Sequence, residues 1–308
     1  MIDVSILMVS YNTSELTCAA IQSVYDQTRD VSFELIVVDN NSSDGSADEI
    51  AKRFPELNLI RLESNIGFAA ANNLASEHAT GKYILLLNPD TVVLDSAIDK
   101  LVGFAEENPE YGIYGGATRF GDMSRNPTAG WNMSTVWSLF STAIGLSSIS
   151  RRSRLFNPES LEWWDWSEPR EVDIVTGCFL CIELDLWRKL EGFDVRFHMY
   201  AEDADLCLRS AEIGKKSILY PEAEIVHLGG ASEGIRADKM SRLLKAKVQL
   251  FNKHWNPLKA RYAIVMLKLW SLSRTLVFRL LYKIKPNKKA SYESWLEIWN
   301  RRCEWVRV

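Results

Sequence analysis

The chain has 308 residues, of which 47% are apolar and 25% charged, with a formal net charge of −4. This length is enough for one large α/β domain and a smaller appendage. A weakly acidic chain gives no general reason to expect nucleic-acid binding. The amino terminus lacks the basic flank and apolar run of a secretory signal, and we find no apolar run of about 18 residues that predicts a spanning helix.

The cysteine pattern argues against a disulfide framework. Five cysteines, an odd number in a chain without a predicted signal, indicate reduced thiols in the cytoplasm. Cys178 and Cys181 have the spacing of a zinc pair, but they lie in an apolar run, 172–182, that predicts a strand. Residues three apart on a strand face opposite ways, and no second pair follows. We therefore predict core cysteines rather than zinc ligands.

The first 107 residues alternate between apolar runs and helical patterns. Unbroken apolar runs are typical of strands buried on both faces, and their alternation with helices predicts a parallel sheet with right-handed crossovers. Ser14 is expected to cap the first helix. The predicted strands are 4–9, 33–38, 57–62 and 83–87, and the predicted helices are 14–27, one ending near 54, 69–79 and 96–107.

Each predicted strand is followed by a polar loop. Ligands of open α/β sheets bind beyond the carboxyl ends of the strands. Asp90, taken alone, could merely cap an Asn-Pro-Asp turn, but four such loops together favour a ligand site. The glycine signatures of dinucleotide-binding and P-loop enzymes are absent, which disfavours both classes. The loops are 10–12, 39–45, 65–68 and 88–90.

Residues 120–170 lose regular periodicity, which predicts long surface loops with a helix near 134–144. The tryptophans of this region could stack on a sugar, lie at a lipid surface or form a packed cluster. The arginines could meet phosphates or belong to a solvated loop. These residues are Trp131, Trp137, Trp163, Trp164, Trp166, Arg151, Arg152 and Arg154.

A second cluster of polar residues lies at the start of a predicted helix, and Gly214 is expected to end that helix. Glu202, Asp203 and Asp205 are more carboxylates than a helix terminus requires, so a cation or a substrate proton is expected nearby. The helix terminus lowers a carboxylate pKa and the neighbouring charges raise it, and the sequence leaves the net direction open. His227 precedes two glycines that let backbone approach a ligand, although a lone histidine can equally be structural.

Taken together, these stretches resemble glycosyltransferase family 2, and in particular its bacterial rhamnosyltransferase-like subgroup. The resemblance covers roughly residues 3–232 and implies a GT-A type α/β fold, with a mostly parallel central sheet flanked by helices. It implies a catalytic domain over 1–233, divided into a nucleotide-binding half (1–118) and an acceptor-binding half (119–233), and a helical extension over 234–308. The matching motifs, in family order, are 9–12, 38–46, 65–69, 88–90, 192–194, 200–209 and His227.

The resemblance assigns roles by position. Asp203 matches the catalytic base, with Glu202 as its competitor. Asp90 and His227 match metal ligands for Mg²⁺ or Mn²⁺. Asn88 stands where the fuller motif has aspartate, so the donor diphosphate is expected to complete the metal's ligands. The predicted substrate-binding residues, with Asp39 holding the nucleotide base, are Ser10, Asn12, Asp39, Asn41, Asn65, Gly67, Asn72, Asn88, Asp205 and Arg209.

The implied activity is transfer of a sugar with inversion. The donor is expected to be a dTDP or UDP sugar, with dTDP-L-rhamnose as the best candidate, and the acceptor a hydroxyl of a lipid-linked or polysaccharide glycan. A non-catalytic nucleotide-sugar-binding or scaffold protein is the alternative. A nucleotidyltransferase is disfavoured because the first loop lacks a glycine-rich basic signature.

The carboxyl-terminal region predicts helices over 234–255 and 258–284. Arg261, Lys268 and Arg279 fall on one side of the second helix, which is otherwise rich in apolar residues. Such a basic stripe is typical of a helix lying in an anionic membrane surface, here the inner face of the cytoplasmic membrane. Packing on the catalytic domain or on a second subunit of an oligomer is the alternative.

Overall fold

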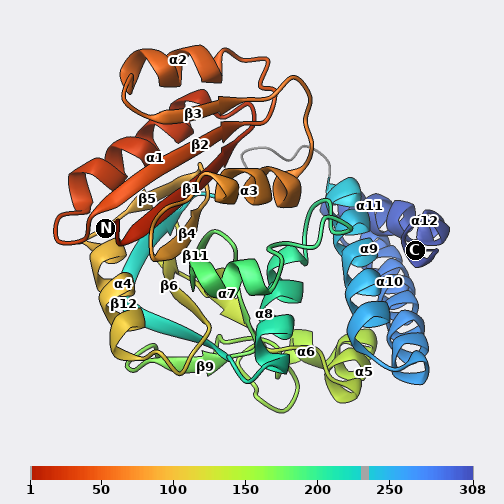
Figure 1. Ribbon diagram of the computed structural model, residues 1–308. Helices are drawn as coiled ribbons and strands as arrows, with labels where there is room; N and C mark the ends of the chain where they lie inside the picture. Colours follow the sequence, from red (N-terminus) through yellow and green to blue (C-terminus); the bar gives the residue numbers. More distant parts are fainter. Residues whose placement is uncertain (1, 230–235, 308) are drawn as a thin grey trace. The chain divides into compact units, whose positions relative to one another are not determined.

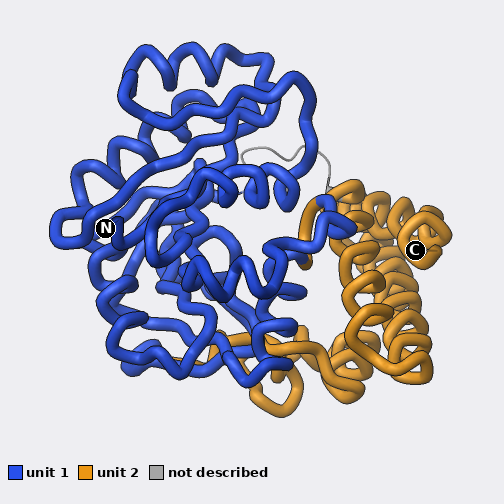
Figure 2. The backbone as a smooth tube through the Cα atoms, viewed as in Figure 1, with its two compact units in different colours: residues 1–131, 166–198, 202–232 blue, residues 132–165, 199–201, 233–308 orange. Residues whose placement is uncertain are grey.

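The computed structural model describes residues 2–229 and 236–307, which divide into two compact units (Figure 2). Unit 1 comprises residues 1–131, 166–198 and 202–232, and unit 2 comprises 132–165, 199–201 and 233–308. The segment 132–165, which the sequence analysis assigned to the acceptor-binding half, therefore groups with the carboxyl-terminal helices. The predicted boundary at 233 and the start of the helix predicted from 234 lie outside the described residues.

Unit 1 is built on a mixed ten-stranded sheet (Figure 1) with the order β3-β2-β1-β4-β11-β6-β12-β5. The strands β3, β2, β1 and β4 are parallel, as predicted, and β11 then runs antiparallel to both β4 and β6. The strands of this sheet are β1 (Val4–Ser10), β2 (Phe33–Asp39), β3 (Asn58–Arg61), β4 (Tyr83–Leu87), β5 (Thr91–Val93), β6 (Ile113–Arg119), β7 (Arg125–Asn126), β9 (Arg170–Val172), β11 (Phe179–Glu183) and β12 (Ser217–His227).

Helices cover this sheet. Apolar residues of α1 and α4 pack with Ile6 and Met8 of β1 in one buried cluster, and α3 packs against β1 and β2 outside that cluster. The short strands β8 (Gly130–Trp131) and β10 (Ile174–Val175) pair separately. The helices of unit 1 are α1 (Ser14–Gln27), α2 (Ser46–Arg53), α3 (Phe68–Glu77), α4 (Ala97–Glu107), a 3₁₀ turn (Pro127–Ala129), α7 (Leu184–Lys189) and α8 (Glu202–Glu212).

Two local predictions need correction, those for the run 172–182 and for Ser14. The run 172–182 is not one strand, because a turn in which the Phe179 N–H donates to the Thr176 carbonyl separates β10 from β11. The later strand β12 is continuous over Ser217–His227, with a register shift between Tyr220 and Glu224. Ser14 does not cap α1 with its side chain; its backbone N–H instead donates to the Asp44 carboxylate, 3.2 Å away.

The cysteine and tryptophan patterns are resolved by burial. Cys178 and Cys181 are buried and free, which confirms their prediction as core residues. Trp164 and Trp166 are buried, so they pack inside the protein, whereas Trp137 is 41% exposed.

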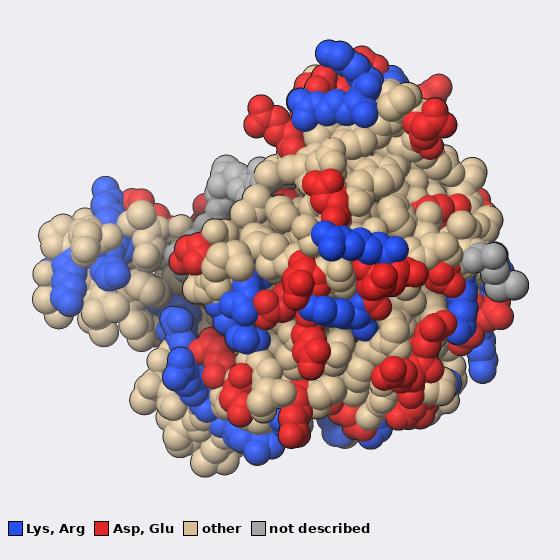
Figure 3. All heavy atoms as spheres, turned by 90° about the vertical axis from the view of Figure 1, so that its left-hand side faces the viewer, with Lys and Arg blue, Asp and Glu red and all other residues tan. Residues whose placement is uncertain are grey.

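On the face shown in Figure 3, basic and acidic side chains are interspersed rather than gathered into a patch of one sign.

Unit 2 is helical. Its apolar core joins Leu139 of one segment to Val248, Leu267 and Trp295 of the carboxyl-terminal helices. In the part of the chain that the structure describes, no helix has the length and apolar character to cross a membrane. The helices are α5 (Val136–Ile144), α6 (Leu146–Ile149), α9 (Arg236–His254), α10 (Pro257–Ile284), a 3₁₀ turn (Pro286–Lys288), α11 (Lys289–Asn300) and α12 (Arg302–Val306).

Two glycines of unit 1 should respond oppositely to substitution by alanine. A Cβ on Gly116 of β6 would collide with the Ala223 carbonyl oxygen and the Phe179 ring, whereas one on Gly103 of α4 meets nothing within 4 Å. We expect Gly116→Ala to lower the free energy of unfolding by about 1–3 kcal/mol, as overpacking does. Gly103→Ala should raise it by about 0.5–1 kcal/mol, because alanine restricts the unfolded chain.

Urea unfolding followed by far-ultraviolet circular dichroism checks this pair. A Gly116→Ala protein as stable as Gly103→Ala would contradict the packing described for β6.

Candidate active site

The first part of the site lies where β1 and β2 end. Ser10 and Asp39 are register partners at the carboxyl ends of these parallel strands, and both are buried. Oδ2 of Asp39 accepts a hydrogen bond from the Ser42 backbone N–H at 3.0 Å. Oδ1 is buried and has no hydrogen-bond partner among the residues that the structure describes. A buried acceptor without a donor is costly, so this oxygen suits a hydrogen-bonding group of a ligand.

The loop after β2 is held in shape by Asn12. Its Oδ1 accepts from the Ser43 backbone N–H at 2.8 Å, and its own backbone N–H donates to the Ser42 hydroxyl. Asn12 and Asn41 both have left-handed backbone conformations, with φ of 53° and 65°, a conformation that asparagine tolerates better than most residues. The Ser10 hydroxyl is 2.9 Å from that of Thr17, so within unit 1 it braces the start of α1.

The segment 65–68 is fixed by a residue that the sequence analysis missed. The buried Asn40 donates from Nδ2 to Asn65 Oδ1 and accepts the Ile66 backbone N–H, which ties this segment to the end of β2. Gly67 has φ of 86°, and a Cβ there would lie 2.6 Å from Nδ1 of His198. Glycine is therefore required at position 67 both by its backbone conformation and by the close approach of an imidazole. The roles of Asn40 and Gly67 are seen only in contacts between residues that are far apart in the sequence, so the sequence patterns did not reveal them.

The side chain of Asn72 folds back onto its own helix, α3. It is 1% exposed, and its Nδ2 donates to the Phe68 carbonyl at 2.9 Å, so it stabilises the first turn of the helix. Its neighbour Asn73 makes two hydrogen bonds to the backbone of Phe193, at 2.8 Å each, and so holds the predicted turn at 192–194 against α3.

The second part of the site joins the residues after β4 to the end of β12. Nε2 of His227 lies 3.4 Å from Oδ1 of Asp90, and the Leu228 backbone N–H donates to the Asp90 carbonyl. Burial alone would raise the pKa of Asp90, but the neighbouring His227 holds it below its ordinary value. Burial opposes the charge on His227, yet interactions with Asp90 and with the neighbouring Cys178 thiol raise the pKa of His227 to about 10. The two residues thus form an ion pair.

The residues around this pair fit a divalent cation. Oδ1 of Asn88 and Nδ1 of His227 are both buried and lack hydrogen-bond partners within residues 2–229 and 236–307. Carboxylate and amide oxygens suit Mg²⁺, and an imidazole nitrogen suits Mn²⁺ as well. Among the described residues no group of three or more His, Cys, Asp or Glu side chains gathers for a metal.

The third part of the site is the amino terminus of α8. Asp203 accepts the Gly177 backbone N–H on Oδ2 at 3.0 Å and the Ala204 N–H on Oδ1 at 2.7 Å. Burial raises the pKa of Asp203 despite these two donors. Burial, followed by repulsion from Asp203, raises the pKa of Glu202 to about 8, and its Oε2 finds no partner in the described part of the chain. The sequence left open whether the helix terminus or the neighbouring charges decide the direction of these shifts. The pKa of both acids is raised, and the largest cause is burial, which the sequence analysis did not weigh.

The backbone just before α8 is strained. Tyr200 and Ala201 have φ of 72° and 67°, the left-handed region that residues with a Cβ rarely adopt. Such strain persists where the surrounding structure over-determines it, and it is common at functional sites.

Asp205 and Arg209, predicted to bind substrate, contact each other. Asp205 is fully buried, and its Oδ2 accepts from Nε of Arg209 at 2.7 Å. Arg209 also donates to the carbonyls of Leu190 and Gly192. The interactions that the structure gives this pair are thus internal, and they fix α8 to the turn at 192–194.

A short turn at residues 176–178 brings these parts together. The Gly177 N–H binds Asp203, and the Cys178 carbonyl accepts the Asn88 backbone N–H at 3.1 Å. A Cβ on Gly177 would lie 3.9 Å from the Phe68 ring, at the start of α3. This turn therefore lies next to the residues after β4, the start of α3 and Asp203 of α8. Its only sequence signal was a glycine inside an apolar run.

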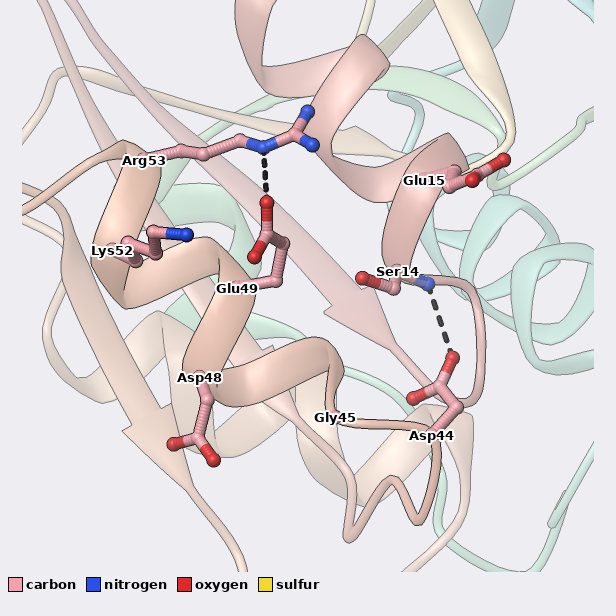
Figure 4. Close-up of a pocket in the computed structure, with 8 residues that line it drawn as sticks. All are labelled: Ser14, Glu15, Asp44, Gly45, Asp48, Glu49, Lys52 and Arg53. Atoms are coloured by element: carbon pink, nitrogen blue, oxygen red, sulfur yellow. Dashed lines mark hydrogen bonds and ion pairs between the residues drawn. The ribbon is translucent and has the colours of Figure 1, made fainter.

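A separate hollow opens between the amino terminus of α1 and helix α2 (Figure 4). Its edge carries the Ser14–Asp44 hydrogen bond and the Glu49–Arg53 ion pair. It contains none of the residues to which the family motifs assign a role, although Asp44 and Gly45 belong to the predicted loop 39–45. The lining residues are Ser14, Glu15, Asp44, Gly45, Asp48, Glu49, Lys52 and Arg53.

Comparison with known families agrees with this geometry. The model of glycosyl transferase family 2 matches residues 5–174, more than half of the chain. The chain therefore belongs to glycosyl transferase family 2 and is a glycosyltransferase, which confirms the resemblance of its motifs.

Individual relatives are more distant. The chain is 27% identical over 212 residues to a Mycobacterium tuberculosis N-acetylglucosaminyl-diphospho-decaprenol L-rhamnosyltransferase, covering 65% of this chain and 68% of the relative. It is 26% identical over 241 residues to the O-antigen biosynthesis protein RfbC of Myxococcus xanthus, covering 76% of this chain and 18% of that protein.

A solved structure shares the fold. The mannosyltransferase PcManGT of Pyrobaculum calidifontis, in complex with GDP-Man and Mn²⁺, superposes with a TM-score of 0.62 at 18% identity, over 99% of this chain and 88% of that one. At this identity the likeness shows the fold alone, and it supports the predicted GT-A architecture.

The buried Glu202 makes the stability of unit 1 depend on pH. Its folded pKa of about 8 lies above the unfolded value of 4.5, so between these values the folded state binds more protons than the unfolded state. Stability should therefore fall as pH rises through this window. Glu202→Gln removes the ionisation, and at pH 8.5 it should be more stable than the wild type by on the order of 3 kcal/mol.

Melting temperatures at pH 4.5 and pH 8.5 measure this effect, with the exposed Glu56→Gln as the matched control. If Glu202→Gln and Glu56→Gln shift the melting temperature equally at pH 8.5, Glu202 is not buried as described.

Proposed function

We propose that this protein is an inverting glycosyltransferase that moves a sugar from a nucleotide-sugar donor to an acceptor hydroxyl in the synthesis of a cell-surface glycan. The observation that carries the proposal is that four predicted site residues, among the ten described residues with a buried polar atom that lacks a partner, come from the ends of strands of one sheet and the start of α8: Asp39, Asn88, His227 and Glu202. All four belong to unit 1, and each was predicted independently as a site residue. A nucleotide sugar and an acceptor hydroxyl would supply the missing partners.

The donor proposed is a pyrimidine nucleotide sugar. The free Oδ1 of Asp39 can accept a hydrogen bond from the N3–H of uracil or thymine. The hydrogen-bonding edge of guanine differs in shape from that of these pyrimidines. The segment 65–67, tied to Asn40, would line the nucleoside and the diphosphate, with Asn41 and Asn12 shaping the adjacent loop. The sugar proposed is L-rhamnose from its dTDP conjugate. The name of the mycobacterial relative, an L-rhamnosyltransferase, supports this choice.

The cation proposed is Mg²⁺ or Mn²⁺, held by Asp90 with Asn88 and His227. When bound, it supplies charge neutralisation for the departing diphosphate. The mannosyltransferase of related fold was solved with Mn²⁺, which supports this assignment. His227 must lose its proton before it can bind a metal, so Asp90 serves alternately as the partner of an imidazolium and as a ligand.

The chemistry assigned to Asp203 is general base catalysis. As the acceptor oxygen attacks the anomeric carbon, its proton passes to the Asp203 carboxylate, and the bond from that carbon to the diphosphate oxygen breaks on the opposite face. One displacement inverts the carbon, as in inverting glycoside hydrolysis. A buried base with a raised pKa accepts a proton more readily than an exposed aspartate. The protonated Glu202 beside it would limit the local negative charge.

The acceptor proposed is lipid-linked, which places the enzyme on the inner face of the cytoplasmic membrane. The decaprenol-linked acceptor in the name of the mycobacterial relative supports this proposal. In this view unit 1 carries the donor and the chemistry, and Asp205 and Arg209 act by holding α8 in place rather than by touching the substrate.

A turnover assay with dTDP-L-rhamnose, Mg²⁺ or Mn²⁺ and a polyprenyl-diphosphate sugar in detergent tests the proposal. Asp203→Asn keeps the shape and removes the basicity, so it should lower turnover by a factor of about 10² to 10⁴. Donor affinity should stay nearly unchanged, and the exposed Asp185→Asn is the matched control. Glu202→Gln should reduce turnover less than Asp203→Asn.

Two outcomes would count against this assignment. A substantially active Asp203→Asn beside an inactive Glu202→Gln would reverse the roles of the two acids. Donor binding without turnover on any lipid-linked or polysaccharide acceptor would favour the alternative, a nucleotide-sugar-binding scaffold protein.

A further inference from the structure

The long helix α10 of unit 2 carries an exposed apolar stripe. We define this apolar stripe as Leu258, Val265, Leu269, Leu276 and Leu280, whose exposed fractions range from 44% to 78%. Their successive spacings of seven, four, seven and four residues keep them on one side of a helix at 100° per residue. Scattered exposed apolar residues are ordinary, but a continuous row along one helix indicates an interaction surface.

The stripe does not serve the packing of unit 2. The core-facing residues of α10 include Ala263, Met266 and Leu267, which are buried with Leu139, Val248 and Trp295. Leu267 lies about 180° around the helix from Leu258. One face of α10 thus holds the unit together, and the opposite face presents large apolar side chains to solvent.

Charge on this part of the chain has one sign. Residues 257–292 contain nine Lys or Arg and no Asp or Glu, in a protein whose formal net charge is −4. Arg261, Lys268, Arg279 and Lys283, here named the basic row, lie about 20–80° to one side of the centre of the apolar stripe. The surface therefore combines apolar side chains with neighbouring cations and lacks carboxylates of its own helix.

Helix α5, which lies beside α10, carries a further pair of exposed aromatic side chains. Within unit 2, the Tyr262 hydroxyl donates to the Val136 carbonyl and the Ser273 hydroxyl to the Ala143 carbonyl, so α5 lies beside α10. The ring centroids of Trp137 and Phe140 are 5.8 Å apart, and both side chains are about 40% exposed. Residues 132–158 also contain no Asp or Glu, and they contain three arginines.

We propose that the apolar stripe, the basic row and the Trp137–Phe140 pair dock unit 2 on an anionic lipid bilayer, with α10 lying in the plane of the interface. Apolar side chains would enter the headgroup region, tryptophan would lie at the interface, and the cations would meet lipid phosphates. Charge complementarity selects this occupant. A second copy would bring a like-charged face against this one, whereas an anionic bilayer supplies the opposite charge.

The proposed bilayer-binding surface makes the membrane association under the proposed function specific, because it names the residues involved, including 136–140. All of these residues belong to unit 2. Vesicle binding is measured without donor or acceptor, so a protein that fails to bind vesicles can be distinguished from one that fails to transfer a sugar.

Co-sedimentation of the full chain with vesicles of phosphatidylglycerol and phosphatidylcholine tests the charge. The triple variant Arg261→Gln, Arg279→Gln and Lys283→Gln removes three exposed cations of the basic row. At about fivefold per charge, partitioning should fall roughly 100-fold. The matched control, Lys52→Gln, Arg188→Gln and Lys189→Gln, removes three exposed cations of unit 1 and should partition like the wild type.

A second variant tests the apolar contact. Leu269→Gln, Leu276→Gln and Leu280→Gln change only exposed side chains, so the melting temperature should hold while vesicle binding falls at least tenfold. Equal partitioning of the two cation variants, or binding to pure phosphatidylcholine as strong as to the anionic mixture, would overturn the proposal. So would a dimer, detected by light scattering and abolished by the leucine variant, in a protein that does not bind vesicles.

Discussion

The constraint on which the site depends is the cost of leaving buried polar atoms without partners. Each such atom costs about 1–3 kcal/mol relative to a satisfied one. In the described part of unit 1 such atoms belong to Asp39, Asn88, His227 and Glu202, and also to the hydroxyls of Thr28 and Ser217. The first four come from the ends of β2, β4 and β12 and the start of α8. A fold selected for stability alone would fill these positions with apolar or paired residues. A ligand that supplied partners to these four atoms would stabilise unit 1, as the proposed function requires.

The topology explains why these groups meet. The four parallel strands β3, β2, β1 and β4 end at one edge, which aligns Ser10, Asp39 and the residues after Leu87. The antiparallel strand β11 then starts at that same edge, because Phe179 pairs with Leu87. The turn before β11 therefore reaches the loops of the nucleotide-binding half and, through Gly177, the acids of α8. One reversal of strand direction thus brings the turn before β11 to both the proposed donor-binding loops and the proposed base, Asp203.

Local sequence patterns predicted much of this arrangement. Apolar runs gave β1, β2 and β4 almost to the residue, and the spacing from 202 to 214 gave α8, because burial and helix termini act over a few residues. The family motifs identified the acids and the histidine. What the patterns could not give depends on contacts between distant residues: the Asp44 carboxylate at the start of α1, the Asn40 bridge to Asn65 and the Asp205–Arg209 pair that braces the 192–194 turn.

The same distinction applies to charge. The sequence predicted three carboxylates at the start of α8, but it left open whether the helix terminus or the neighbouring charges decide the direction of their pKa shifts. The structure decides for burial, which raises the pKa of Glu202 and of Asp203. A run of apolar residues likewise predicted a strand at 172–182, whereas the turn at 176–178 that breaks it is held by partners on β4 and α8. The element most important for assembling the site was thus the least visible in the sequence.

Calorimetric titration of the wild type and of Asp39→Ala with dTDP, UDP and GDP shows whether the unpartnered Asp39 oxygen receives a nucleobase. We expect dTDP or UDP to bind the wild type more tightly than GDP does. We also expect Asp39→Ala to weaken pyrimidine-nucleotide binding by about 1.5–3 kcal/mol, with Asp185→Ala unchanged. Equal binding of dTDP and GDP, or an Asp39→Ala protein that binds as the wild type does, would contradict this role of Asp39.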